Sequence, residues 1–598
     1  MKNYKIPQII FAGVVILSMV LAACAPSTSA PQPTTPPQEQ PTKAPEATKP
    51  PAPTKAPEAT KPPAPTNTPA PTATPAAKVW EGEVAISLQG EDTQTWKALC
   101  DAYMVKNPKV TCSVELKPAE GYQDWIRTQF AGGTPRPSLV NGNVVADLMS
   151  AKKFINFEDY MDKPNPYNAG KKWSESFDQS VMALSRDPVT GDLYHLSLEL
   201  VKIIWFYNKD IAAKIGMTTP PQNWDELGSW MTKAKDAGYI PWSIGGDFQE
   251  FWEMRIGWLA RMYQDGFYAS PEKWDLSRCQ PGDWCFVKGV DDKFPEANWQ
   301  SDPYFDDSNK VHQNFARWLN AFKDGKMGPK DPQYIALMKE FKKVFTPENL
   351  PPGWTGVSGT TAYSLFLSGK ALFWLDGGWM ISTFQKDMNN LRTGKFFSAG
   401  AGTPTPTPDP SFQTIKAFEF GTFDNPKMMA PEALAPWQRT IEWPVGFWSV
   451  PVKEQKQNDL ELDFLMYVTS PEGYGIYVQN KIDPNNPKGG LTGPFIVKGV
   501  ALPPEVAAMF KDLKPIGNTE KTTAGSGFSR GIADYQPMVR EWVNLAQQYF
   551  TGKIDLDTYI QKYDEVLRRP DLWKGMLEQV KLTEDDLAHP EKKPVSQQ

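Results

Sequence analysis

The stretch from Tyr194 to Lys235 constrains the fold of this chain more than any other part of its sequence. Within it, an apolar run from Ile203 to Tyr207 leads into a polar Asn-Lys-Asp turn, a short helical segment and a Pro-Pro break. Asn223 and Glu226 then stand where a helix cap and its reciprocal partner belong. One face of the following helix repeats at helical spacing as Trp224, Leu227, Met231 and Ala234. A buried strand that leads into a capped amphipathic helix predicts an α/β domain.

Length and charge narrow the class of protein. The 598 residues are enough for a large core and for more than one domain. With a net charge of −6 we predict no nucleic-acid partner. The chain has three histidines, His195, His312 and His589, which are far apart in the sequence. The sequence therefore gives little support for a histidine metal site or a Ser-His-Asp triad. The sequence also has no G-x-S-x-G, H-E-x-x-H or Walker A motif, and we predict no cofactor and no metal.

The first residues predict export and a lipid anchor. Lys2 and Lys5 precede an apolar run from Ile9 to Ala23, which is too short for a typical spanning helix and predicts a signal peptide over residues 1–23. The run ends Leu-Ala-Ala-Cys and resembles the bacterial lipobox, in which the cysteine, here Cys24, is diacylated and becomes the mature N-terminus. Two acyl chains hold a protein stably on a membrane. The alternative is an uncleaved anchor with an incidental cysteine.

Residues 24–77 predict a disordered linker. They are rich in Pro, Thr, Ala and Lys, and the sequence TKAPEATKPPAP occurs at Thr42–Pro53 and again at Thr54–Pro65. Such a composition cannot bury a core. A polyproline-like spacer of this length reaches on the order of 150 Å when extended at about 3.1 Å per residue, so it carries the folded part away from the membrane.

The folded part opens with a strand–helix–strand pattern. Val84–Leu88 and Val110–Leu116 read as strands, and between them one helix face is marked by Trp96, Leu99 and Tyr103. The turn after the first strand lies at the carboxyl end of the sheet, where α/β proteins bind ligands. Gln89 and Asp92 in this turn are therefore candidate ligand contacts.

Three motifs farther along the chain resemble those of one family. The first is Tyr-Asn-Lys-Asp at 207–210 followed by Pro-Pro-Gln-Asn-Trp-Asp-Glu-Leu at 220–227. The second is Phe-Leu-Ser-Gly-Lys-Ala at 366–371 with Gly-Gly-Trp at 377–379, and the third is a helix that ends Thr-Ser-Pro-Glu-Gly at 469–473. They resemble the extracellular solute-binding proteins of sugar-type ABC importers, the family of maltose-binding protein. The chain departs from the family at Asn223, where Thr is usual, and at Arg136, where the family has Asp.

The resemblance implies a two-lobed α/β fold of the periplasmic-binding-protein type II class, with a hinge that the chain crosses several times. We expect residues 78–200 and 445–490 in the first lobe. Residues 201–444 and 491–585 are expected in the second lobe, followed by a C-terminal tail at 586–598.

The resemblance also implies ligand contacts. Trp379 matches the tryptophan that stacks on sugar in the maltose-binding branch, and Tyr207 matches a tyrosine that faces sugar there. Glu199 lies where sugar-binding relatives often place a polar contact. In each case a core role is the alternative for the aromatic side chain.

Further candidates come from loops and from the Trp-dense stretch between Trp242 and Gln300. The Asn-Gly-Asn loop at 141–143 is predicted to lie at the ligand cleft, and an ordinary turn is the alternative. The remaining predicted ligand contacts are Asn141, Asn143, Trp252, Trp443 and Arg530.

Apart from Cys24, the chain has Cys100, Cys112, Cys279 and Cys285. In an exported protein they can pair, and neighbour pairing of 100 with 112 and of 279 with 285 is one of three connectivities. Free buried thiols are the alternative.

Taken together, these patterns predict a membrane-tethered binding protein of an ABC importer. It would be a monomer outside the cytoplasm that captures a carbohydrate, in first place an oligosaccharide, and delivers it to membrane permease subunits. A polyol, or a sugar phosphate held by Arg530 or Lys202, stays open as the ligand. A cell-surface glycoside hydrolase with two carboxylates about 5–10 Å apart is the main alternative. A tethered adhesin or a sensor subunit is another.

Overall fold

The computed structural model describes residues 79–89, 92–118, 122–141, 145, 148–149, 151–182, 185–186, 192–268, 270–293, 311–393, 415–433, 441–483, 486, 490–504, 507 and 530–597. The predicted signal peptide, Cys24, the predicted linker and Asn143 lie outside these residues. Among the described residues, no helix is both long and apolar enough to cross a membrane.

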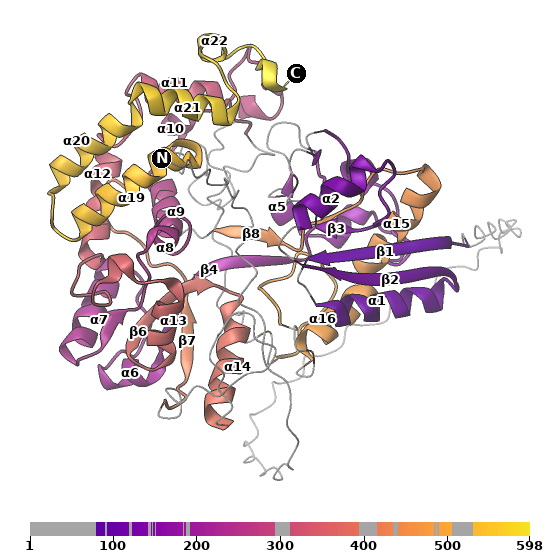
Figure 1. Cartoon of the computed structure of the whole chain (residues 1–598), viewed down its shortest axis with the longest axis horizontal. Coiled ribbons are helices and arrows are strands. Elements are labelled where there is room, and N and C mark those ends of the chain that lie inside the picture. The colour runs from indigo at the N-terminus through magenta and orange to yellow at the C-terminus, as the bar shows by residue number, and fades with distance from the viewer. Residues whose placement is uncertain are drawn as a thin grey trace, which may run out of the picture.

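The described chain folds into two α/β lobes, each with its own core (Figure 1). The first core draws its residues from 84–200 and from 448–497, and the second from 203–441 and 532–587. The predicted α/β fold with two lobes is therefore confirmed. Ile496 and Val497 pack in the first core, although they fall in the stretch that the sequence placed in the second lobe.

The first lobe is built on the strand–helix–strand unit that the sequence predicts. β1 (Glu81–Gln89) pairs in parallel with β2 (Lys109–Lys117), and α1 (Thr93–Lys106) connects them. Val84, Ile86 and Leu88 alternate along β1 because successive strand side chains point to opposite faces, and they join the first core. The other elements of this lobe are α2 (Tyr122–Ala131), β3 (Val140–Asn141), α4 (Glu158–Met161), η2 (Trp173–Ser176), α5 (Gln179–Met182), β9 (Trp448–Ser449), α15 (Gln455–Val468) and α16 (Pro471–Ile482).

The second lobe surrounds a mixed sheet with the strand order β5-β6-β4-β7. Its members are β4 (Glu199–Asn208), β5 (Ile240–Trp242), β6 (Ala371–Gly377) and β7 (Phe420–Phe423). Along β4, Ile203 and Trp205 pack in the second core, while Ile204 and Phe206 pack in a separate cluster on the opposite face. Because both faces are covered, the strand reads as a continuous apolar run in the sequence.

Helices cover both faces of this sheet. In α7 (Trp224–Asp236), Asn223 Oδ1 accepts from the Glu226 N–H at 2.9 Å, while the Glu226 carboxylate accepts from the Gln222 N–H and the Asn223 amide. The other helical elements are α6 (Lys209–Lys214), α8 (Phe248–Trp252), α9 (Ile256–Tyr268), α10 (Pro271–Asp275), η4 (Asp291–Lys293), α11 (Phe315–Lys323), α12 (Pro332–Val344), η6 (Trp354–Gly356), α13 (Gly359–Leu367), α14 (Met380–Thr393), η8 (Ile532–Asp534), α19 (Gln536–Phe550), α20 (Leu556–Leu567), α21 (Pro570–Val580), α22 (Glu584–Ala588) and η9 (Val595–Gln597).

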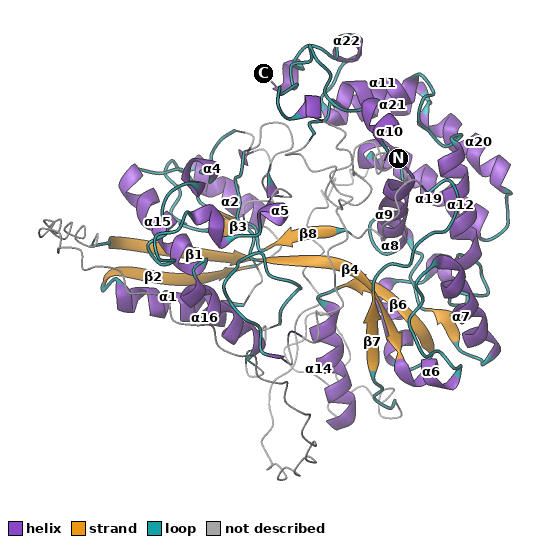
Figure 2. Ribbon diagram, turned by 180° about the vertical axis from the view of Figure 1, so that it is seen from behind, coloured by secondary structure: helices purple, strands orange, loops and turns teal. Residues whose placement is uncertain are grey.

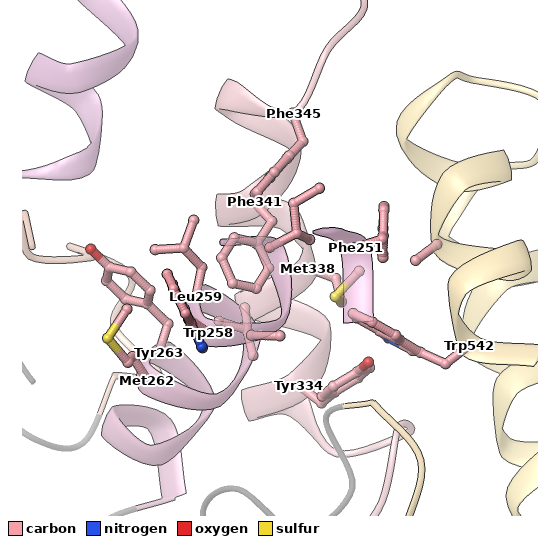
Figure 3. Close-up of a cluster of buried hydrophobic side chains, with 14 of the residues drawn as sticks. Phe251, Trp258, Leu259, Met262, Tyr263, Tyr334, Met338, Phe341, Phe345 and Trp542 are labelled. Atoms are coloured by element: carbon pink, nitrogen blue, oxygen red, sulfur yellow. The ribbon is translucent and has the colours of Figure 1, made fainter. Parts of the chain in front are cut away.

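The core of the second lobe is dominated by aromatic side chains (Figure 3). α8, α9, α12 and α19 meet there, with Phe251, Trp258, Tyr334 and Trp542 among the contributing residues. The cluster encloses a void of about 10 Å³ with an apolar lining, which has room for a single water molecule at most. This void is a packing gap and not a ligand site.

The lobes are joined by extended segments, which we call the lobe junction (Figure 2). The first half of β4 pairs with β8 (Glu442–Val445), whereas its second half pairs with β6 and β7. Glu199 also forms a bridge with Phe495. The chain therefore passes between the lobes along β4, along β8 and near residue 495.

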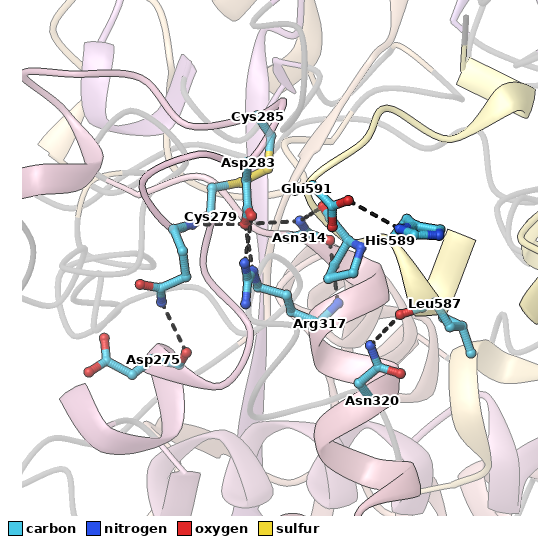
Figure 4. Close-up of polar contacts among 12 residues, drawn as sticks. Asp275, Cys279, Asp283, Cys285, Asn314, Arg317, Asn320, Leu587, His589 and Glu591 are labelled. Carbon is cyan, nitrogen blue, oxygen red and sulfur yellow. Dashed lines mark hydrogen bonds and ion pairs between the residues drawn. A yellow bond between two sulfur atoms is a disulfide. The ribbon is translucent and has the colours of Figure 1, made fainter. Parts of the chain in front are cut away.

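The C-terminal residues dock on the segment around the second disulfide (Figure 4). Cys279 is bonded to Cys285, and Cys100 is bonded to Cys112, so the neighbour pairing is the one present. Asp283 lies within the disulfide loop and takes a bidentate ion pair from Arg317, with both contacts at 2.6 Å. Backbone carbonyls of the C-terminal segment accept from this region, namely those of Leu587, Pro590 and Glu591. We call this arrangement the C-terminal clasp.

Candidate ligand-binding site at the lobe junction

Trp379 lies beside the junction on the side of the second lobe, and two further tryptophans belong to the same part of that lobe. The N–H of Gly378 donates to the Lys202 carbonyl at 2.8 Å, which places the turn after β6 beside the first half of β4. Trp379 follows directly and is partly exposed. Its ring meets Trp258 of α9 edge to face, with ring centroids 6.1 Å apart and planes at 77°. We call Trp252, Trp258 and Trp379 the aromatic wall.

Glycines allow this wall to form. The Trp379 ring lies so close over Gly377 that an added Cβ would be 2.2 Å from a ring carbon. At Gly257 an added Cβ would be 2.0 Å from the Trp252 carbonyl oxygen, so α9 can begin against the end of α8 only with glycine there. The first glycine of the Gly-Gly-Trp motif thus has a steric reason in this fold.

Arg530 is built into the same wall. Its guanidinium lies over the Trp252 ring at 5.1 Å, one nitrogen donates to the Trp252 carbonyl, and another binds Asp534 at 2.7 Å. The side chain is buried, so its charge is engaged with groups of the protein. The predicted role as a direct ligand contact is thereby less favoured than a role in holding Trp252.

A carboxylate that the sequence did not single out lies beside Trp252. Glu253 is partly buried, and this burial raises the pKa of its carboxyl, although the charges of Arg530 and Arg261 work in the opposite direction. Gln249 donates to it from the preceding helical turn. Trp258 and Glu253 were hard to predict because neither the many tryptophans nor the 69 acidic residues are distinguishable by type alone.

The first-lobe side of the junction carries amides. Ile86 bridges to Leu139 in parallel, so Gln89 and Asn141 lie at neighbouring carboxyl ends of β1 and β3. Both are buried, at 6% and 4% exposed. Among the described residues, Gln89 Oε1 and Asn141 Oδ1 have no hydrogen-bond partner. A buried acceptor without a partner calls for an explanation, and at the carboxyl end of a sheet a polar ligand would provide one.

Tyr122 fixes the ends of these two strands. Its hydroxyl donates to the Ser87 carbonyl at 2.8 Å and accepts from the Asn141 N–H at 3.1 Å. We call Gln89 and Asn141 the amide wall. The structure thus places these two predicted residues on neighbouring strands of the first lobe.

Other predicted residues have different surroundings. Asp92 caps α1. Its side-chain oxygens accept hydrogen bonds from Thr95 and, at 2.8 Å, from the Asn486 amide, so both oxygens are engaged within the protein. Asn143 and the side chain of Trp443 lie outside the described residues, although the Trp443 backbone pairs with Val201 in the junction.

Glu199 acts on the hinge itself. Its carboxylate accepts from the Tyr477 hydroxyl at 2.6 Å, and from the N–H and hydroxyl of Thr492 at 2.5 and 2.6 Å. It therefore ties β4 to the crossing near residue 495 and to α16.

Tyr207 lies at the opposite end of β4 from Glu199, about 26 Å away at about 3.3 Å per residue. Its ring covers Gly421 and packs toward Phe423, which separates it from the aromatic wall. Trp242 is fully buried against Trp205 in the second core.

The fold and this junction define a class: an α/β binding protein with two lobes that face each other across a multiply crossed hinge. The sequence profile of the bacterial extracellular solute-binding proteins matches residues 89–474, more than half of the chain. The chain therefore belongs to that family.

Individual relatives are distant. A protein of Brucella abortus, named only as a candidate binding protein, is 26% identical over 168 residues, which are 27% of this chain and 38% of that one. A Brucella suis protein matches to the same extent. Among solved structures, a family 1 extracellular solute-binding protein from Bifidobacterium longum subsp. infantis is similar with a TM-score of 0.50 and 16% identity. That similarity covers 81% of this chain and 98% of the other, and it supports the fold.

Proposed function

We propose that this protein captures an oligosaccharide between its lobes and delivers it intact to an ABC permease. The observation that carries the proposal is the aromatic wall at the junction of a solute-binding protein. Membership of an extracellular binding-protein family supports the import role.

The chemistry of the two walls suits a sugar. Sugar rings present apolar C–H faces, which stack on indole rings, and many hydroxyls, which need acceptors and donors. In the proposed complex Trp379 stacks on one sugar ring and Trp252 stacks on a neighbouring ring. Gln89, Asn141 and Glu253 accept hydrogen bonds from hydroxyl groups.

A ligand held by both lobes shifts the open–closed equilibrium toward the closed form. β4, β8 and the segment near residue 495 carry that motion, and Glu199 couples two of them. In the proposal the closed form is the one that the permease recognises. The protein acts as a monomer tethered through acylated Cys24, with residues 24–77 as the spacer.

The test is a thermal-shift screen of the chain from Lys78 to Gln598. The panel contains maltotriose, cellotriose, xylotriose, raffinose, xylitol and glycerol 3-phosphate. A ligand that binds only the native state raises the melting temperature. We expect a rise with at least one trisaccharide, which chromatography recovers intact. Absence of any shift would contradict the sugar assignment, and recovery of shorter sugars would favour a hydrolase.

A further inference from the structure

A buried ion network is formed by residues that are close in the sequence to the aromatic wall. Arg255 sits between α8 and α9, and its Nη1 donates to Glu250 Oε2 at 2.5 Å. Its Nη2 donates to Asp376 Oδ2 at 2.7 Å. The guanidinium also lies over the Trp374 ring at 4.5 Å. The side chains of Arg255, Glu250 and Asp376 are at most 8% exposed.

A contribution to folding stability is a poor explanation for this network. Two carboxylates share one guanidinium, and burial raises the pKa of both Glu250 and Asp376 although Arg255 works against that rise. Buried ion networks are often no more stabilising than apolar side chains of the same volume. What such a network does supply is a fixed geometry, because a planar fork must meet both partners at once.

Each member of the network is within three residues, in the sequence, of a tryptophan of the aromatic wall. Glu250 is two residues before Trp252 on α8, and Asp376 is three residues before Trp379. Arg255 immediately precedes α9, which carries Trp258. One guanidinium therefore joins the three chain segments from which the wall is built.

The backbone around the network has little freedom to move. Arg255 has a φ of +29°, which a non-glycine residue keeps only where its surroundings hold it. An added Cβ at Gly359 would lie 2.0 Å from Glu250 Oε1, and one at Gly245 would lie 2.6 Å from Glu250 Cγ. Asp376 Oδ1 also accepts from the Gly377 N–H at 2.8 Å. The network is thus seated against closely packed glycine backbone on two sides.

We propose that Arg255 is a positioning residue of the ligand site. It does not contact the ligand. It sets the placement of Trp252, Trp258 and Trp379, so that sugar rings can stack on the two partly exposed ones, Trp252 and Trp379. The role in affinity rests on the function proposed above, whereas the role in placing the tryptophans does not.

The test compares Arg255→Met with Arg317→Met in the full folded chain. Arg317 is a matched control because it forms a bidentate pair with a buried carboxylate in the same lobe, but in the C-terminal clasp. Both proteins are labelled with 5-fluorotryptophan, and the ¹⁹F resonances of the wall are assigned from Trp252→Phe, Trp258→Phe and Trp379→Phe. We expect Arg255→Met to shift or broaden these three resonances, and Arg317→Met to leave them in place. Wall resonances that stay unchanged in folded Arg255→Met would overturn the proposal.

Affinity gives an independent readout. For the tightest binder among maltotriose, cellotriose and xylotriose, we expect Arg255→Met to raise Kd at least tenfold, and Arg317→Met less than twofold. Arg255→Lys keeps the charge but loses the forked guanidinium, so its Kd should fall between those of the wild-type protein and Arg255→Met. An equal loss in both Met variants would assign Arg255 a general stabilising role and overturn the proposal. If no panel sugar binds the wild-type protein, the proposed function fails, while the ¹⁹F comparison still decides the positioning role.

Discussion

The two sides of the lobe junction differ in chemistry and in how they are held. The aromatic wall of the second lobe consists of tryptophans fixed by Arg255 and Arg530 and by glycines that leave no room for a side chain. The amide wall of the first lobe consists of Gln89 and Asn141, whose side-chain oxygens are buried and have no hydrogen-bond partner among the described residues. The difference suggests a division of work. In the proposed complex, stacking on fixed indoles supplies most of the affinity, while the amides choose among hydroxyl patterns.

The largest expected effect comes from breaking the aromatic wall. Trp379→Ala should weaken sugar binding by about 2–3 kcal/mol, or roughly 30- to 160-fold, because a central aromatic anchor is lost. Isothermal titration with the best panel trisaccharide measures this. Trp230→Ala, on the partly exposed face of α7, is the matched control and should leave Kd unchanged. A similar loss of affinity in Trp379→Ala and Trp230→Ala would contradict a specific role of Trp379 in sugar binding.

A region outside both walls should affect stability alone. Replacing Cys279 and Cys285 by Ser removes a short disulfide loop, which should lower the unfolding free energy by about 2 kcal/mol. Sugar affinity should stay the same because the loop belongs to the C-terminal clasp. Denaturant unfolding gives the unfolding free energy, and titration of the same preparation gives the sugar affinity. A parallel loss of affinity would show that the C-terminal clasp influences the ligand site at the lobe junction.

A smaller effect is expected from the amide wall. Asn141→Ala should cost about 1 kcal/mol of binding, close to fivefold, since one hydrogen bond to a hydroxyl is lost. The loss should differ among trisaccharides, whereas Trp379→Ala should weaken all of them alike. Titration of both variants across the panel checks this contrast. Uniform losses from Asn141→Ala would assign the amide wall to general affinity.

The smallest effect concerns the pH dependence of the buried ion network around Arg255. Burial raises the pKa of Glu250 above its usual value of 4.5, so the folded state holds this proton more tightly than the unfolded state does. The stability contributed by this group therefore falls as pH rises from about 4.5 through the folded-state pKa. We expect the wild-type protein to gain stability relative to Glu250→Gln between pH 7.5 and pH 5. Urea unfolding at both values measures the difference, and the opposite trend would contradict the raised pKa.

Much of the fold could be predicted from the sequence because its signals are local. The apolar run before Asn208, the cap at Asn223 and the Gly-Gly-Trp motif each depend on neighbours within a few residues. The site was only partly predictable, since its contacts join distant parts of the chain. Glu199 meets Thr492, and Arg255 meets Asp376, across 293 and 121 residues. Asp92 shows a further limit, because a polar residue after a strand suits a helix cap as well as a ligand contact.

The central claim is that a sugar lies between the two walls. Its most direct test is a crystal structure of the chain from Lys78 to Gln598 with the trisaccharide that gives the largest thermal shift. We predict a sugar ring stacked on Trp379, with a hydroxyl of the same molecule bound to Asn141 or Gln89 and the lobes closed around it. A sugar bound to one lobe only, or at a place remote from Trp379, would contradict the account.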